Sequence, residues 1–245
     1  MGLIAVDHDR SSAGEWRRDG NTLMSDSTTG GMDATVTVAD VEDVGPDTYA
    51  IRFETPAGFT AEPGQFVKLG TEIDGESVAR FYTLSSPTVE ETFEVTVGID
   101  PEDGGPFSAF LASIEPGVEM SLSGPFGDHH YDGERRVVIL AGGPGIGPAV
   151  AIAERAVTEG GEAAIVYRDD DPAHAARLKR LRDSGARIYL LDGDAELDAA
   201  TADVVTDAGD EGVFVYGFAD FVADAEAAIE ATIGDADEAK VENFG

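Results

Sequence analysis

The sequence contains no cysteine. This absence excludes disulfide bonds, thiolate nucleophiles, cysteine-ligated zinc and any iron–sulfur cluster held by this sequence itself. A one-electron relay through such a cluster must therefore lie elsewhere. Histidine is also scarce: His129 and His130 are adjacent and His174 stands alone, so the H-x-x-x-H spacing of a zinc site does not occur. We predict no metal site and expect solvated or capping roles for these histidines.

Cationic residues are few as well. Lysine and arginine together number 16 against 49 aspartates and glutamates, which gives a formal net charge of -33. That excess repels nucleic acid phosphates, so we predict no nucleic-acid partner. Repulsion among the carboxylates would also strain a compact state in dilute buffer, whereas concentrated salt screens it. The composition resembles that of cytoplasmic proteins of salt-accumulating archaea; the alternative is an acidic mesophilic protein.

Long hydrophobic runs are missing too. No apolar stretch approaches the roughly 20 residues that span a bilayer, so we predict no membrane span. Residues 1–32 contain Arg10, Arg17 and Arg18 without a continuous hydrophobic segment between them, which does not match a secretory signal. We therefore expect a cytoplasmic protein. The same residues lack sustained periodicity, which predicts a flexible N-terminal extension outside the fold.

The first half of the remaining chain has the texture of β-structure. A short segment, Ser108–Ile114, has apolar residues at helical spacing and is expected to cap the strands. Turn signals separate six β-rich runs, which predicts a small antiparallel Greek-key barrel over residues 33–131. The expected strands are Thr35–Val41, Thr48–Glu54, Gln65–Glu72, Ala79–Ser85, Phe93–Ile99 and Val118–Leu122.

The second half alternates between strands and helices. The change falls near Asp132–Arg135, so we place a second domain at residues 132–245. Alternation of this kind predicts a Rossmann-like α/β domain with a parallel sheet and helices on both faces. The expected strands are Arg136–Leu140, Ala163–Tyr167, Ile188–Leu191, Val213–Tyr216 and Lys240–Phe244, with helices at Gly147–Thr158, Ala173–Asp183, Asp198–Asp207 and Ala219–Ile233.

One expected barrel strand carries an arginine, an aromatic ring and a hydroxyl on a single face. In Arg80-Phe81-Tyr82-Thr83-Leu84-Ser85-Ser86, alternate residues share a face. A guanidinium suits a pyrophosphate, and Tyr82 suits a flat aromatic ring. Thr83 or Ser86 could hydrogen-bond the edge of that ring or a phosphate. The alternative is an ordinary barrel strand in which Arg80 pairs with a surface carboxylate.

The pattern Arg-x-Tyr-Thr-x-x-Ser resembles the flavin motif of the ferredoxin–NADP reductase superfamily. The resemblance implies that Arg80 holds the FAD pyrophosphate, that Tyr82 packs against the isoalloxazine and that Thr83 lies near flavin N5. Gly105-x-x-Ser108, at the expected start of the capping helix, resembles the second FAD phosphate motif of that family. The alternative for these two residues is a turn followed by a serine N-cap.

A glycine-rich loop follows the first parallel strand. Glycines allow a close approach of the backbone to a pyrophosphate, and a helix N-terminus attracts its charge. The common dinucleotide fingerprint would need glycine at position 148, which is Pro148. The loop resembles instead the Gly-Gly-x-Gly-x-x-Pro loop of the reductases, although Pro144 replaces a hydroxyl residue; a tight turn without a ligand is the alternative. The expected nucleotide-binding residues are Gly142, Gly143, Gly145, Gly147 and Pro148.

Three further features concern the nucleotide. Arg168 is followed by the acidic run Asp169–Asp171, whose charge opposes a 2′-phosphate and favours NADH over NADPH. The alternative is that Asp171, which precedes Pro172, caps the next helix. Many relatives end a late strand with cysteine and glycine; here Gly217 fits and the thiol is missing. Phe244 resembles the aromatic residue that covers the flavin in this family, and a hydrophobic plug closing the sheet is the alternative.

The resemblance covers residues 33–245 and implies an FAD-dependent NAD(P)H oxidoreductase. Hydride would pass between nicotinamide C4 and flavin N5, with Tyr82, Thr83 and Phe244 beside the reacting rings, and electrons would continue to an acceptor such as a separate ferredoxin. A second interpretation is the electron-transfer subunit of a larger oxidoreductase. A third is a non-catalytic nucleotide-binding module with a regulatory role, to which the altered Pro144 and the missing thiol point.

Overall fold

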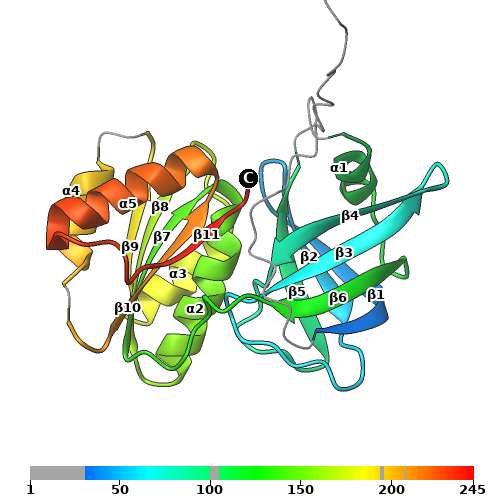
Figure 1. Cartoon of the computed structure of the whole chain (residues 1–245), viewed down its shortest axis with the longest axis horizontal. Helices are drawn as coiled ribbons and strands as arrows, with labels where there is room; N and C mark the ends of the chain where they lie inside the picture. The colour runs from blue at the N-terminus through cyan, green and yellow to red at the C-terminus, as the bar shows by residue number, and fades with distance from the viewer. Residues whose placement is uncertain (1–30, 100–104, 194–195, 207) are drawn as a thin grey trace, which may run out of the picture.

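The computed structural model describes residues 31–99, 105–193, 196–206 and 208–245, which form two domains placed side by side (Figure 1). One domain is built on an antiparallel sheet and the other on a parallel sheet, which confirms the predicted fold class. The predicted N-terminal extension lies outside the described residues except at its end, because the first strand begins at Met32. No helix in the described part of the chain is long and apolar enough to cross a membrane.

The antiparallel sheet has six strands in the order β4-β3-β6-β1-β2-β5. A bridge between Leu84, just beyond β4, and Val95 of β5 joins its two edges, so the sheet closes into a barrel. The helix α1 (Gly105–Ala112) lies against this barrel and buries Phe107 and Leu111. The strands are β1 (Met32–Gly45), β2 (Thr48–Glu54), β3 (Phe66–Ile73), β4 (Glu76–Thr83), β5 (Thr92–Gly98) and β6 (Glu119–Phe126).

The barrel core explains the alternating pattern of the strands. Phe53 and Phe93 stack with their ring centroids 5.3 Å apart, and both are fully buried. The hairpin between β3 and β4 turns at Asp74 and Gly75, which both have positive φ, as a type I′ turn requires. That tight turn sets the register of β4, because a one-residue slip would turn every side chain to the opposite face.

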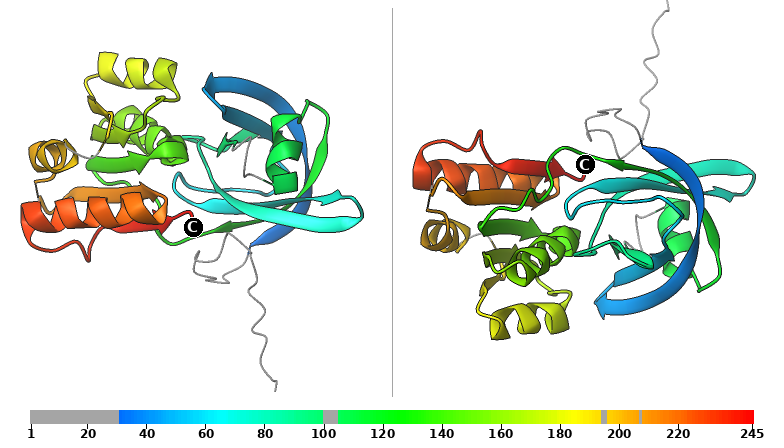
Figure 2. Two further views of the ribbon diagram at one scale, coloured as in Figure 1. Left: turned by 90° about the horizontal axis from the view of Figure 1, so that it is seen from above. Right: turned by 90° about the horizontal axis from the view of Figure 1, so that it is seen from below.

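The parallel sheet has the order β11-β10-β7-β8-β9. Its central strand is buried on both faces and therefore reads as a continuous apolar run. Helices α2 and α3 cover one face, and α4 and α5 cover the other (Figure 2). The elements are β7 (Arg136–Gly142), the 3-10 turn η1 (Gly143–Gly145), α2 (Ile146–Thr158), β8 (Glu162–Arg168), α3 (Ala175–Asp183), β9 (Arg187–Leu191), α4 (Leu197–Val204), β10 (Glu211–Gly217), α5 (Ala219–Ile233) and β11 (Lys240–Asn243).

Some element ends differ from the sequence-based expectation, for tertiary reasons. β1 extends to Gly45 because its first part pairs with β6 and its second part with β2. β4 ends at Thr83, two residues early, since the chain then crosses to β5. α3 begins at Ala175 because His174, its N-cap residue, has a left-handed φ of 56°. Asp171 therefore does not cap that helix.

Candidate active site between the barrel and the parallel sheet

Strand β4 presents the arginine and the tyrosine of the flavin-like motif. Tyr82 is half-buried, and its ring stacks with Phe107 of α1 at 6.4 Å between centroids. Burial raises the pKa of Tyr82 above its ordinary value, so the phenol is neutral. The Arg80 guanidinium donates a hydrogen bond to the Ala79 carbonyl at 2.9 Å and has no ion pair within the described part of the chain. In a chain so rich in carboxylates, this leaves a cation suited to an anionic ligand.

Thr83 ends β4 as a buried polar residue. Its side chain is 5% exposed, and its Oγ1 has no hydrogen-bond partner among the described residues. A buried hydroxyl without a partner costs about 1–3 kcal/mol. A polar ligand atom that reached this buried position would satisfy the hydroxyl. The Thr83 Oγ1 is therefore a buried polar atom of this strand that a ligand could supply with a hydrogen-bond partner.

Ser86 lies in a different setting from Tyr82 and Thr83. Because β4 ends at Thr83, Ser86 belongs to the loop toward β5, and its Oγ accepts a hydrogen bond from the Glu94 N–H at 2.6 Å. This hydroxyl has a protein partner, and Ser86 lines a polar hollow beside α2 and α3. The alternation that would place Ser86 on the Tyr82 face does not continue past the end of the strand.

The second phosphate-like motif lies at the start of α1. Gly105 begins the helix with a φ of 68°, and no atom lies within 4 Å of where its Cβ would be. Ser108 is half-buried in the first turn. Phe107, between them, is the ring on which Tyr82 stacks. The structure thus brings this helix start to the strand that carries Arg80, over a separation of more than twenty residues in the sequence.

The glycine loop after β7 is tightly packed. A Cβ on Gly145 would lie 2.2 Å from the Tyr216 carbonyl oxygen, and one on Gly142 would lie 2.5 Å from the Phe221 ring. Both distances are far below a van der Waals contact. Packing inside the α/β domain therefore requires these two glycines whether or not a nucleotide binds.

The other residues of the loop differ in how closely they are packed. A Cβ on Gly147 would lie 2.6 Å from the Thr96 Cβ of β5, so this glycine permits the two domains to touch. Gly143 has a φ of 54° and no atom within 4 Å of its Cβ position. Pro148 is buried in the first turn of α2. Gly143 is the member of the loop whose backbone a ligand could approach.

Asp169, which directly follows β8, is held in a defined orientation. Asp169 accepts hydrogen bonds from the Tyr167 hydroxyl at 3.0 Å and from the Asp171 N–H at 2.9 Å. Arg168 bonds Asp224 of α5 at 3.0 Å and lies over the Phe221 ring. The carboxylate at the end of β8 is thus fixed by its neighbours, and the adjacent arginine is directed toward α5.

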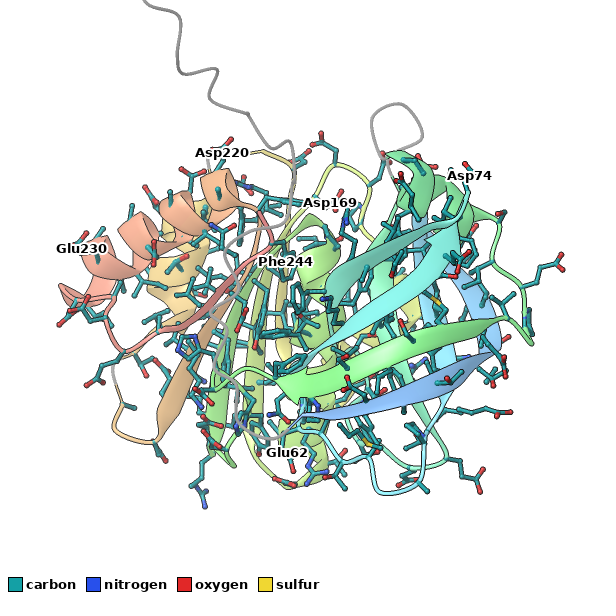
Figure 3. All side chains as sticks on the ribbon, turned by 45° about the vertical axis from the view of Figure 1, so that its right-hand side comes forward. Glu62, Asp74, Asp169, Asp220, Glu230 and Phe244 are labelled. Carbon is teal, nitrogen blue, oxygen red and sulfur yellow. The ribbon has the colours of Figure 1, made fainter. Side chains whose placement is uncertain are left out.

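The C-terminal aromatic residue lies between the domains (Figure 3). The Phe244 N–H bonds the Gly217 carbonyl at 2.9 Å, which continues the parallel pairing of β11 with β10. Its ring meets the edge of Phe218, which is 53% exposed. Gly217 itself packs under Phe221, with a Cβ position 2.6 Å from that ring. Phe244 is thus held by its backbone while its ring contacts an exposed neighbour.

Several polar residues of the domain boundary were not predicted from the sequence. Glu242 is 8% exposed, and its Oε1 lies 3.7 Å from the Cβ position of Gly127 in the barrel. Burial raises the pKa of Glu242 to about 7. His174 was expected to be solvated or capping; it is 3% exposed and shares a hydrogen bond with Thr96 at 2.8 Å, with no side-chain cap bond. Nothing in the local sequence marks these residues, because their partners are distant in the chain.

Comparison with known proteins agrees with this arrangement. Residues 35–131 match the oxidoreductase FAD-binding domain family. The chain is 38% identical over 109 residues to the glycine betaine monooxygenase reductase subunit of Chromohalobacter salexigens, covering 43% of this chain and 29% of that protein. It is 30% identical over 175 residues to the ferredoxin reductase component of 3-ketosteroid-9-alpha-monooxygenase of Mycolicibacterium smegmatis, covering 67% and 49%. These matches span less than half the length of either relative.

Solved structures share the fold of both domains. A ferredoxin NADP+ reductase from Neisseria gonorrhoeae with bound FAD and NADP superposes with a TM-score of 0.68 at 17% identity, over 87% of this chain and 99% of that one. An Amycolatopsis cytochrome P450 reductase gives 0.72 at 22% identity, over 87% and 70%. The chain has the two-domain fold of these reductases. The matched FAD-binding domain and this fold support its place in the ferredoxin–NADP reductase superfamily.

Substitution of Gly145 tests the packing of the glycine loop. Gly145→Ala should destabilise the protein by about 1–3 kcal/mol, because the new methyl group meets the rigid Tyr216 carbonyl. The φ of Gly145 is an ordinary −59°, so the effect would be steric. Gly209→Ala is the matched control, since its Cβ would meet nothing within 4 Å. Chemical denaturation in strong salt measures both; equal midpoints would contradict the tight loop.

Glu242 predicts a specific pH dependence. Its folded-state pKa, about 7, lies above the ordinary value of 4.5, so the protonated form favours the folded state. The stability linked to it is present below about pH 4.5 and is lost as the pH rises through 7, a change of ~3 kcal/mol. Glu242→Gln should thus become increasingly more stable than the parent between pH 5 and pH 8. Glu238→Gln, at an exposed position, is the control and should show no such trend. The free energy of unfolding of the three proteins, measured by chemical denaturation across this pH range, tests the prediction. The same pH dependence in all three would refute the raised pKa of Glu242.

Proposed function

We propose that this chain is an FAD-dependent NAD(P)H oxidoreductase. Bound FAD would supply the redox chemistry, exchanging a hydride at N5 with nicotinamide C4 and releasing electrons to a separate acceptor. The observation that carries the proposal is the set of groups on β4: the Arg80 cation without a carboxylate partner in the described residues, the half-buried Tyr82 ring and the orphaned Thr83 hydroxyl. Cation, ring and hydroxyl match the pyrophosphate, the isoalloxazine and its heteroatom edge.

The residues of the barrel would bind and orient the flavin. Arg80 would pair with the pyrophosphate, and the start of α1 at Gly105 and Ser108 would add backbone N–H and hydroxyl donors. Tyr82 would pack against the isoalloxazine, and Thr83 would hydrogen-bond its N5 region. Ser86 would act indirectly, because its hydroxyl already bonds the Glu94 backbone and holds the loop that follows Thr83.

The α/β domain would bind the nucleotide. The backbone at Gly143 and the start of α2 would receive the pyrophosphate, while Gly142, Gly145 and Gly147 let the loop pack closely enough to reach it. Gly217 and Pro148 would line the same edge of the sheet. Phe244 would cover the flavin until the nicotinamide displaces it.

The residues after β8 favour NADH. The Asp169 carboxylate, oriented by Tyr167, can accept a hydrogen bond from a ribose 2′-hydroxyl and would repel a 2′-phosphate. The neighbouring Arg168 is directed to Asp224 and Phe221, away from the role of a phosphate clamp.

The acceptor would be a separate oxidoreductase subunit or a ferredoxin. Two relatives are named as a reductase subunit and a ferredoxin reductase component of monooxygenases. This sequence has no cysteine, so an iron–sulfur cluster in the relay would lie outside it. The large excess of carboxylates supports a cytoplasm with concentrated salt as the setting.

Anaerobic titration of protein purified in strong salt tests the reaction. The purified protein should be yellow, and NADH should bleach the flavin absorbance at a lower concentration than NADPH does. Preference for NADPH would overturn the role of Asp169 alone. A colourless protein that takes up no FAD, or bound flavin that neither nucleotide bleaches, would refute the enzyme and favour a non-catalytic module.

Arg80→Ala should lose the flavin. Removal of a charge-assisted contact to a pyrophosphate costs about 1.5–3 kcal/mol, which corresponds to a roughly 10- to 150-fold weaker Kd. Lys68→Ala, which removes an exposed cation from the neighbouring strand β3, serves as the matched control and should keep the parent affinity. Equilibrium binding of FAD to the flavin-free parent and variants gives their Kd values. Equal constants for Arg80→Ala and the parent would remove Arg80 from the site.

A further inference from the structure

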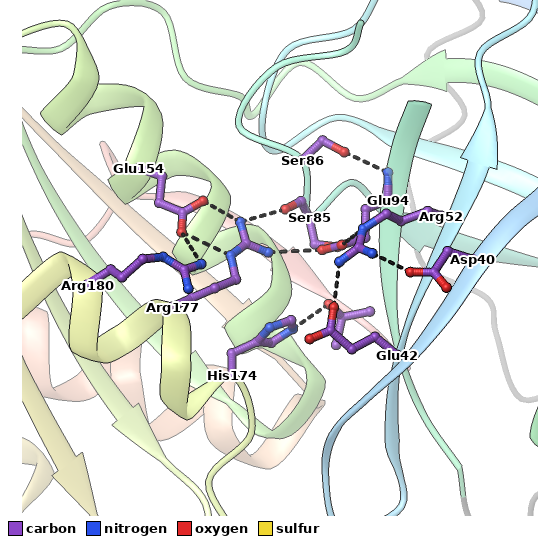
Figure 4. Close-up of polar contacts among 11 residues, drawn as sticks. Asp40, Glu42, Arg52, Ser85, Ser86, Glu94, Glu154, His174, Arg177 and Arg180 are labelled. Atoms are coloured by element: carbon purple, nitrogen blue, oxygen red, sulfur yellow. Dashed lines mark hydrogen bonds and ion pairs between the residues drawn. The ribbon is translucent and has the colours of Figure 1, made fainter. Parts of the chain in front are cut away.

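Arg177 of α3 joins the two domains through a fan of hydrogen bonds (Figure 4). Within the α/β domain it makes two bonds to Glu154 of α2, at 3.0 and 2.7 Å. Toward the barrel it bonds the Glu94 carboxylate at 2.9 Å and the Ser85 carbonyl at 2.9 Å. Its side chain is 13% exposed, so these bonds are largely shielded from water. One guanidinium thus ties two helices of one domain to a strand and a loop of the other.

Glu94 of β5 is the barrel residue that receives this bond. Its carboxylate also accepts bonds from Arg52 of β2 at 3.0 Å and from the Ser85 hydroxyl at 3.1 Å, and it is 11% exposed. Arg52 in turn pairs with Asp40 and Glu42 of β1. Two barrel groups, Arg52 and the Ser85 hydroxyl, therefore hold the Glu94 carboxylate in place independently of Arg177.

A second polar contact accompanies the first. The His174 N–H bonds the Val44 carbonyl of β1 at 2.8 Å, and its ring bonds the Thr96 hydroxyl. Burial, together with the charge of the nearby Arg177, lowers the pKa of His174 to about 3, so the ring is neutral. Thr96 is also the residue against which Gly147 of the nucleotide loop packs. The polar contacts and the glycine loop thus meet the same strand of the barrel.

These bonds reach the loop that directly follows the candidate flavin strand β4. Ser85, whose carbonyl accepts from Arg177 and whose hydroxyl donates to Glu94, is two residues beyond Thr83. The surroundings form a polar hollow between the domains, lined by residues such as Arg180 and Thr92. Most of the side chains that line this hollow are polar, and the bonds of Arg177 join the two domains beside it.

We propose that Arg177 and Glu94 are a pair of positioning residues that set the orientation of the nucleotide domain relative to Tyr82 and Thr83. The inference rests on the proposed function for its kinetic consequence, though not for its geometric one. Transfer of a hydride depends steeply on the distance and alignment of the two rings, so a small rotation of one domain would slow it. Neither residue touches the reacting atoms; both act through the domain boundary.

Distance measurement tests the geometric part directly. The sequence has no cysteine, so Glu119→Cys on the barrel and Glu226→Cys on α5 introduce two unique, exposed positions for spin labels. Double electron–electron resonance on the labelled protein should give one narrow distance distribution. Arg177→Ala should broaden it, and Glu94→Gln should broaden it in the same way. Lys179→Ala is the matched control, because that exposed cation of α3 pairs with Asp183 of its own helix and with no other carboxylate among the described residues, and it should leave the distribution narrow.

Rapid-reaction measurement of flavin reduction tests the kinetic part. At saturating NADH, Arg177→Ala should lower the rate constant by about tenfold to a hundredfold, with the flavin content and nucleotide Kd of the parent. Arg177→Lys should lie between, because an ammonium keeps the charge and loses the planar fork. The double variant of Arg177→Ala and Glu94→Gln should be no slower than Arg177→Ala alone, since both remove one shared interaction.

The outcomes separate the two proposals. A parent protein whose flavin is not bleached defeats the proposed function, and the distance distributions then still decide whether Arg177 holds the domains. A narrow, parent-like distribution for Arg177→Ala overturns the positioning role. A broadened distribution with an unchanged rate constant overturns the link to hydride transfer. A loss of bound flavin in the single variant Arg177→Ala would likewise contradict the inference, because a residue that only orients the domains should leave the flavin strand and its affinity for FAD unchanged.

Discussion

Gly147 and Thr96 lie so close that a Cβ on the glycine would be 2.6 Å from the Cβ of the threonine. This contact brings the start of α2, which would receive a nucleotide pyrophosphate, directly against strand β5 of the barrel. Strand β5 in turn meets the end of β4 at the Leu84–Val95 bridge. The candidate flavin strand and the candidate nucleotide loop are therefore separated by one strand. A bulkier side chain at position 147 would push the domains apart and open the site.

Polar bonds add a defined orientation to this contact, because packing at one point does not fix the rotation of one domain relative to the other. Arg177 reaches Glu94, and His174 reaches Thr96 and the Val44 carbonyl. Hydrogen bonds to charged groups are short and directional, and their cost of breaking is high where water is excluded. The Glu94 carboxylate is largely shielded from water and is shared between Arg52 and Arg177. The Glu94 carboxylate therefore helps to orient the two domains through its bond to Arg177.

The fold and the linear motifs could be predicted from the sequence because their causes are local. The Asp74–Gly75 turn, the alternation along the strands and the apolar run of β7 each act over a few residues, and they define the barrel and the parallel sheet. Arg80, Tyr82 and Thr83 were recognised because one strand carries all three in a known spacing. Ser86 shows the limit of that reasoning, since a strand that ends early cannot keep its alternation.

The sequence by itself determined two domains, their order and the residues that carry the flavin-like and nucleotide-like motifs. Only the tertiary structure decided which glycines are required by packing, that Thr83 is left with an orphaned hydroxyl, that His174 and Glu242 are buried, and that Arg177 bonds across the domain boundary. The reason is physical. A motif reflects bonds between neighbours in the chain, whereas burial and pairing depend on groups far apart in sequence; Arg177 and Glu94 are 83 residues apart. Among the arginines of α3, nothing but its partners distinguishes Arg177.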